Sequence, residues 1–219
     1  MLIHKLTCTI IFGVIMSFMQ TCSTHALERH SYRQTTGSDS FDFSWELTIS
    51  ETNVLEVRGN GEYYENICDD RCRTIEWRYV TDDHDITAFR DDDVIRVEGT
   101  FENKPFIKGF KIDDLPWYQP LSYSLRCFID SPDQKTAFWM IRPDTLDVIK
   151  FQARKLSKER IMLQGRSVMA VKVELGLTSM LKGLWHAHYW FSEADGIFLQ
   201  YRGVHGMPGT PETIVRMIE

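Results

Sequence analysis

Apolar side chains recur at every second position along much of this chain. The clearest run covers residues 41–49, where aromatic and aliphatic residues alternate with polar ones. The same alternation runs through residues 75–79, 95–101 and 171–175, and a last strand is expected at 213–218. Successive side chains of a β-strand point to opposite faces of its sheet. Each run therefore predicts a strand with one buried face.

Short turn sequences separate these runs. Gly and Asn fill positions 59–61, three aspartates precede Val94, and Asp-Gly stands at 195–196. Asp and Gly tolerate the positive φ angles that tight hairpins need. Strands joined by short turns pair antiparallel. Residues 28–38 are polar, and we expect a loose N-terminal tail there.

One segment breaks the strand rhythm. Leu121, Leu125 and Phe128 follow helical spacing, and Asp-Ser-Pro at 130–132 predicts the end of that helix. A second brief helical turn is expected at 144–148. The predicted helix has one apolar face, which would pack on the sheet or plug one end of it.

The pattern as a whole predicts a mainly β (α+β) fold. We expect a single curved antiparallel sheet or half-barrel, with one or two short helices packed on it. No linker or internal repeat divides residues 27–219, which are about the length of one generous domain.

The first 26 residues have the layout of a secretory signal peptide. Lys5 precedes an apolar run at 6–19, and small residues at Thr24 and Ala26 place cleavage before Leu27. The apolar run is short for a membrane span, and no second such run follows. The sequence thus predicts a cleaved leader at 1–26, a periplasmic or secreted mature protein, and no transmembrane anchor in it.

A lipoprotein signal is the nearest alternative. Cys22 follows the apolar run, as an acylated cysteine would. However, Met-Gln-Thr at 19–21 is a poor lead-in, because lipoprotein cleavage favours an aliphatic residue and then small residues before the cysteine. A cleaved leader fits better.

Composition supports a packed core and limits the partners. Hydrophobic residues make up 43% of the chain and aromatic residues 12%, which can fill a sizeable core. The formal charge of −6 argues against nucleic acid as a partner. No run of Lys and Arg marks a site for anionic lipid.

Three cysteines lie beyond the leader. Cys68 and Cys72 flank a three-residue polar spacer, and in an oxidising compartment we expect a disulfide between them. The spacing fits neither a redox nor a haem motif. Cys127 lies in an apolar helical pattern, where an inert buried thiol is expected.

Sites for chemistry are sparse. His186 and His188 would share one face of a strand, which suits two ligands of a metal site, but no third ligand follows at a recognisable spacing. Two solvated or hydrogen-bonded histidines are the simpler interpretation. The aspartate clusters at 82–85 and 91–93 lack the spacing of a calcium loop. No nucleophile elbow or phosphate-binding loop occurs, and we expect no catalytic residue and no cofactor.

Two aromatic stretches suggest either core or a cavity wall. Phe138 and Trp139 lie in a nearly continuous apolar run, as do Trp185 and Trp190. Such runs form strands buried on both faces or line an apolar container. These four side chains are the candidates for ligand binding, and ordinary core is the alternative.

The C-terminal half resembles a known group of proteins. The sequences at 159–161, 165–173 and 189–199, the last with Trp-Phe and then Asp-Gly, resemble uncharacterised exported bacterial proteins. Their pattern is similar to the lipoprotein-carrier-like half-barrel, an antiparallel sheet curled around a helix. The resemblance implies a periplasmic location but no activity and no binding residue, and the N-terminal half departs from it.

These observations favour a non-enzymatic envelope protein. We expect its curved sheet to bind an apolar, lipid-like ligand or a protein partner. One alternative is a metal-dependent hydrolase or metal-binding protein that uses His186 and His188. Another is a structural assembly factor of the cell envelope.

Overall fold

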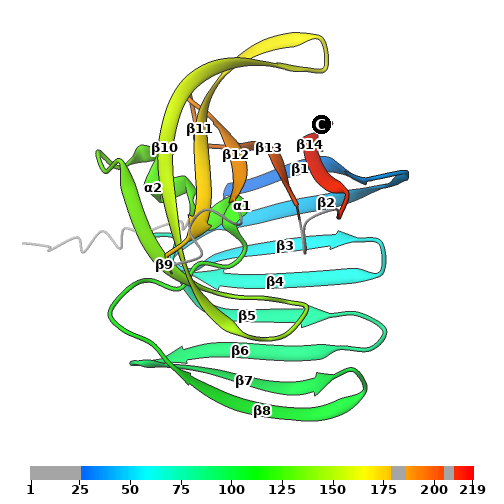
Figure 1. Cartoon of the computed structure of the whole chain (residues 1–219), viewed down its shortest axis with the longest axis vertical. Coiled ribbons are helices and arrows are strands. Elements are labelled where there is room, and N and C mark those ends of the chain that lie inside the picture. Colours follow the sequence, from blue (N-terminus) through cyan, green and yellow to red (C-terminus); the bar gives the residue numbers. More distant parts are fainter. Residues whose placement is uncertain (1–25, 179–185, 205–209) are drawn as a thin grey trace, which may run out of the picture.

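A computed structural model describes residues 26–178, 186–204 and 210–219 of the protein. In these residues it has fourteen strands in one sheet and two short helical segments (Figure 1). The bounds are β1 Ala26–Thr36, β2 Asp39–Ile49, β3 Asn53–Gly59, β4 Glu62–Cys68, β5 Thr74–Val80, β6 Asp85–Asp91, β7 Val94–Phe101, β8 Lys104–Lys111, α1 Leu121–Ser124, α2 Arg126–Asp130, β9 Lys135–Ile141, β10 Val148–Leu163, β11 Arg166–Leu177, β12 His186–Ser192, β13 Phe198–Val204 and β14 Glu212–Met217.

The sheet consists of two meanders joined at one place. The order is β8-β7-β6-β5-β4-β3-β2-β1-β14-β13-β12-β11-β10-β9, so neighbours along the chain are neighbours in the sheet except where β1 meets β14. Every pair of strands is antiparallel. The joint runs from Tyr32 opposite Met217 to Thr36 opposite Thr213.

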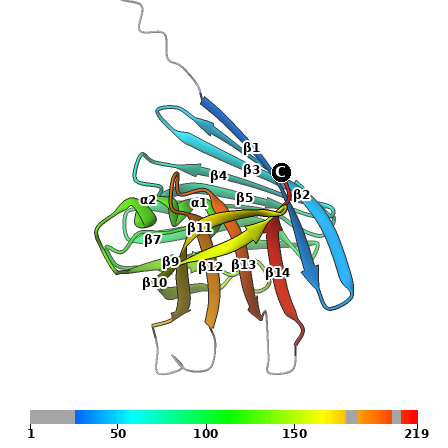
Figure 2. The same cartoon turned by 90° about the horizontal axis from the view of Figure 1, so that it is seen from above.

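The sheet coils, so that the two meanders form facing walls (Figure 2). The largest apolar cluster combines residues from both walls, for example Leu47 and Leu55 with Val173 and Phe191. A sheet with one apolar face must bury that face, and here the far half of the same sheet covers it.

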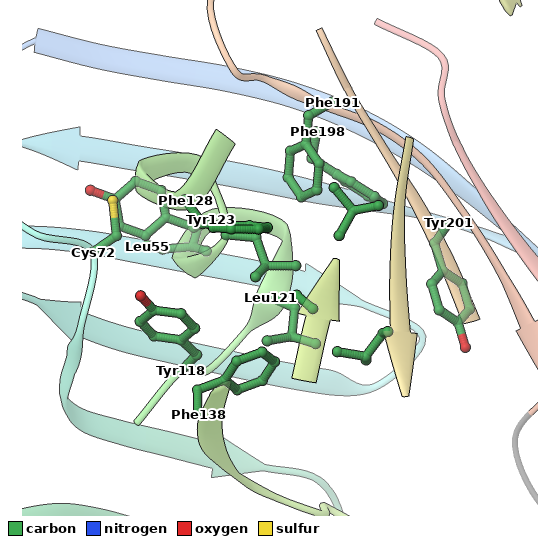
Figure 3. Packing of buried hydrophobic residues seen from close by; sticks show 14 of the residues in the cluster. Leu55, Cys72, Tyr118, Leu121, Tyr123, Phe128, Phe138, Phe191, Phe198 and Tyr201 are labelled. Atoms are coloured by element: carbon green, nitrogen blue, oxygen red, sulfur yellow. The ribbon is translucent and has the colours of Figure 1, made fainter. Parts of the chain in front are cut away.

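The helical segments occupy the space between the walls. Leu121, Tyr123, Leu125 and Phe128 belong to the large cluster, amid residues of both meanders (Figure 3). A second cluster lies between β5–β7 and the hairpin β9–β10, where Trp77 and Ile95 share a core with Leu146. Apolar side chains therefore fill the concave side of the sheet both around the helical segments and beside the β9–β10 hairpin.

Most elements expected from the sequence are present. The runs at 41–49, 75–79, 95–101 and 171–175 lie within β2, β5, β7 and β11, and the run at 213–218 coincides with β14 except for its last residue. The helix after Pro120 is confirmed as α1 and α2, and the mainly β fold with a curled antiparallel sheet is confirmed.

Two local predictions were wrong. Residues 28–38 are not a loose tail, because 26–36 form β1, which is paired along both edges. Their polar composition reflects an outer face that carries ion pairs, such as Arg33 with Asp42. Residues 144–148 form a hairpin turn before β10 and not a helix, with Leu146 at a φ of 56°.

The predicted leader lies almost wholly outside the described residues, since only Ala26 of it is described, as the first residue of β1. In the described part of the chain, no helix has the length and apolar character needed to cross a membrane.

Candidate ligand-binding pocket

An apolar pocket lies on the concave face, where the two walls approach α1. Its volume is about 220 Å³. One wall comes from β2, β3 and β4, the other from β12, β13 and β14, and the start of α1 completes it. The lining residues are Phe43, Trp45, Val57, Tyr64, Pro120, Leu121, Ser122, Tyr189, Phe198, Tyr201 and Val215.

The alternating pattern of the strands explains this lining. Phe43 and Trp45 come from the apolar side of the run at 41–49, and Val215 comes from the last predicted strand. Residues two apart on a strand share one face. The side chains that the pattern predicts to be buried therefore turn toward the inside of the coil, where they meet the opposite wall.

The pocket has no charged side chain among its lining residues. Its polar atoms are already partnered in two places: the Trp45 indole Nε1 donates to the Ser122 hydroxyl at 3.3 Å, and the Tyr64 hydroxyl donates to the Glu62 carboxylate at 3.1 Å. An apolar lining with a few placed polar groups is typical of sites for apolar ligands.

The phenols of the pocket stay neutral at ordinary pH. Burial raises the pKa of Tyr64 and of Tyr201 above the usual value for tyrosine, and it raises the pKa of Tyr189 well above that value. The charged phenolate is the form that burial disfavours. The pocket therefore offers hydroxyl groups but no negative charge.

Three contacts hold the helical segments over the inside of the coil. A disulfide joins Cys127 of α2 to Cys72 in the β4–β5 turn, with their Cα atoms 5.9 Å apart. Arg126 Nη1 donates to both carboxylate oxygens of Glu28 on β1, at 3.0 and 2.8 Å. Arg126 Nε donates to the carbonyl of Asp195 in the β12–β13 turn. The helical segments are thereby fixed to both meanders.

The cysteine pairing predicted from the sequence was wrong. Cys72 pairs with Cys127, 55 residues away, and not with Cys68. Cys68 is a buried free thiol, whose sulfur accepts a hydrogen bond from Asn66 Nδ2 at 2.8 Å. The reason is directional: Cys68 ends β4 facing the core, whereas Cys72 lies in the following turn, over which α2 passes. Cys127 is therefore not the inert thiol that its helical pattern suggested.

The aromatic residues proposed as ligand contacts are dispersed. Phe138 is fully buried in the large cluster, with its ring 5.0 Å from that of Tyr118. Trp139 Nε1 donates to the Asp113 carboxylate. Trp190 belongs to a third apolar cluster, and its Nε1 donates to the Glu159 carboxylate. None of these three lines the pocket, and Trp185 lies outside the described residues.

The histidine pair stands on β12 with ring centroids 5.6 Å apart. His188 lies opposite Glu174 on β11 and Arg202 on β13. Among the residues the structure describes, no group of three or more His, Cys, Asp or Glu side chains is placed to hold a metal ion. Burial lowers the pKa of His188, and Lys172 lowers it further.

Sequence reasoning missed the lining residues of both walls, because none of its described candidates lines the pocket. Val57 and Tyr64 on β3 and β4 face Tyr201 and Phe198 across the pocket, although they are far apart in sequence. The available signal was the alternation at 41–49. It marked the buried side of one wall but not the wall it would face.

Comparisons with known proteins show the fold. No protein family and no curated protein matches the chain. Among solved structures it is similar to a "Beta-barrel-like Protein of Domain of Unknown Function DUF1849 from Brucella abortus", with 11% identity and a TM-score of 0.61 over 90% of this chain and 96% of that one. A hypothetical lipoprotein, YmcC from Escherichia coli, aligns with 10% identity and a TM-score of 0.43 over 87% of each chain.

Proposed function

We propose that the protein is a non-enzymatic component of the bacterial envelope that binds an apolar, lipid-like ligand in the pocket between its two walls. The observation that carries this proposal is the lining: six aromatic side chains, no charge, and a position inside the coil. Burial of an apolar molecule there gains about 25 cal/mol for each Å² removed from water.

The size of the pocket limits the ligand. A dry cavity of roughly 150 Å³ accepts a benzene-sized molecule, and sites for drug-sized ligands have volumes of about 300 Å³ or more. The pocket, at about 220 Å³, falls between these values. It suits a segment of a hydrocarbon chain or one small ring system, with a polar head left outside.

The envelope location rests on two observations of different kinds. The sequence predicts a cleaved leader at 1–26, and the structure has a disulfide between Cys72 and Cys127. Disulfides persist in oxidising compartments such as the periplasm and are rare in the cytosol. The two observations favour the same compartment.

A matched pair of variants on β14 tests ligand binding. Val215 lines the pocket, and Ile214 is its neighbour on the other face of the same strand. Val215→Phe fills part of the cavity, so we expect at least a tenfold loss of affinity for a fluorescent fatty acid. Ile214→Phe adds the same ring outside and should bind as the wild type does.

Fluorescence titration with the fatty acid measures both affinities, and circular dichroism checks that both variants are folded. Equal affinities of Val215→Phe and the wild type, or no saturable binding by the wild type, would remove the pocket from the proposal. Native mass spectrometry of gently purified protein supplies a second readout, the mass of any retained lipid.

A further inference from the structure

The hairpin of β10 and β11 extends past its neighbours in the sheet. β10 has 16 residues and β11 has 12, but β9 pairs only with 148–154 and β12 only with 170–176. Residues 157–169 are here called the overhang. On either side of the turn at 164–165, its strand residues pair only across the hairpin, with no strand on their outer edges. Figure 1 shows it arching over one end of the molecule.

One face of the overhang is anchored. Ile161, Leu163 and Val168 pack in a cluster with Trp190 and Leu199. At the turn, the Gln164 amide donates a hydrogen bond to the carbonyl of Ile218. The overhang is held against the body of the protein, so its other face is presented in a fixed orientation.

That other face is apolar and basic. Directly paired strand residues point to the same side, and Arg160 pairs with Met169 while Met162 pairs with Ser167. Met162 is 65% exposed and Met169 is 38% exposed. Unbranched thioether side chains adapt to irregular apolar surroundings, and arginine can keep its charge at an interface while its stem is buried.

Charge is polarised along the long axis of the molecule. Residues 148–177, the hairpin, carry seven Lys and Arg against two Glu. Residues 62–111, which span β4–β8 at the opposite end in Figure 1, carry thirteen acidic and eight basic residues. The hairpin cations are scattered in sequence, which is why no basic run is visible there, and the fold gathers them.

Arg160 shares the face of the exposed methionines and is available for a partner. Among the described residues it forms no ion pair, whereas Lys158 is paired with Glu193 and Arg154 with Glu174. Arg166 pairs with Leu163 and therefore lies on the anchored face. A cation with no internal carboxylate keeps its full attraction for an external anion.

We propose that the exposed face of the overhang docks on the surface of an anionic lipid bilayer. The two methionines enter the headgroup region, and Arg160 contacts lipid phosphates. Stable attachment to a bilayer generally needs two signals, an apolar one and a basic one, and this face supplies both. The proposal does not depend on occupancy of the pocket.

The other end of the molecule provides an internal contrast. Ile107 on β8 is 81% exposed, more than either methionine. It lies in a surface depression with four carboxylates and one cation, which are Glu65, Glu76, Asp85, Glu98 and Arg78. An anionic bilayer would repel those carboxylates, so exposure of an apolar side chain alone does not make a docking site.

Vesicle flotation tests the proposal. The protein is mixed at low salt with vesicles of phosphatidylglycerol and phosphatidylcholine, or of phosphatidylcholine alone. We expect binding to the first and at least tenfold weaker binding to the second. All variants keep the same N-terminus, so any contribution of residues 1–25 is equal among them.

Three variants separate the contributions. Met162→Ser with Met169→Ser should weaken binding to the anionic vesicles by about tenfold or more, and Arg160→Gln by about fivefold. Ile107→Ser removes a more exposed apolar side chain and should leave binding unchanged. All four positions are solvent-exposed, and circular dichroism confirms folding of each variant.

Unchanged binding by the methionine double variant and by Arg160→Gln would overturn the proposal, as would equal binding of the wild type to neutral vesicles. Val215→Phe distinguishes docking from capture of lipid in the pocket. It should bind vesicles as the wild type does, and its failure to bind them would overturn docking through the overhang.

Discussion

Cys72 and Cys127 close a loop of 55 residues between the β4–β5 turn and α2. A disulfide that closes a loop of this length restricts the unfolded chain and typically contributes about 2–4 kcal/mol. We expect the double variant Cys72→Ser, Cys127→Ser to lose that amount in its free energy of unfolding. Urea denaturation followed by tryptophan fluorescence measures the loss.

Cys68→Ala is the control for that experiment, because it removes a cysteine and leaves the disulfide intact. A loss as large in Cys68→Ala as in the double variant would contradict the assigned pairing. Burial raises the pKa of the Cys68 thiol to about 12, so the thiolate needed for disulfide exchange or alkylation is scarce at neutral pH.

For a single residue, the sequence indicates whether the side chain is buried better than it indicates which residues the side chain contacts. It placed Phe43 and Trp45 on a buried face because alternation is local. It could not pair Cys72 with Cys127, since that contact depends on where α2 lies over the β4–β5 turn. The same limit applies to Trp190, because its nearly continuous apolar run predicts burial without showing which side of the sheet the side chain faces.

The hairpin of β9 and β10 is fastened to the segment that follows β8. The Asp113 carboxylate accepts hydrogen bonds from Trp139 Nε1 at 2.7 Å and from Lys150 Nζ. These contacts, with Lys150 first, lower the pKa of Asp113 to about 2 from an ordinary 3.8. The stabilisation of the folded state by these contacts is therefore complete above about pH 4, and it is lost as the pH falls toward 2.

Asp113→Asn tests this fastening. Compared with the wild type, we expect the variant to be less stable at pH 6 and nearly as stable at pH 2. Thermal unfolding at the two values, read by tryptophan fluorescence, gives the comparison. Asp114→Asn changes the adjacent exposed carboxyl and serves as the control. A difference between Asp113→Asn and the wild type that stays constant with pH would contradict the ion pair.

Elements were predicted well where one period dominated the sequence. β2, β5 and β7 are half-buried strands and show it by alternation. β1 was missed because its outer face carries ion pairs such as Arg29 with Glu46, and its polar composition resembles that of a tail. The overhang was also missed, because nothing in the local sequence shows that the hairpin of β10 and β11 extends past β9 and β12.

The joint between β1 and β14 holds the two meanders in one sheet, because it is the sole strand pairing between them in the described sheet. Residues 213–216 of β14 are paired along both edges, so their backbone N–H groups face a partner strand. Ile214→Pro removes one such donor within an interior strand, and we expect a cost of about 3 kcal/mol or more.

Ile107→Pro places the same residue in β8, which has a neighbour on one edge only. Its cost should be clearly smaller. Chemical denaturation of the two variants makes the comparison, and an equal cost at both positions would argue against β14 as an interior strand. The walls of the pocket come from opposite sides of this joint, which local sequence patterns do not reveal.

The joint also sets an order of events during synthesis. The hairpins from β1 to β8 pair with sequence neighbours and can form as the chain emerges, because their contacts are local. The strand that unites the halves is made after all the others. Until β14 is in place, β1 therefore has one unpaired edge, and such an edge can pair with another chain.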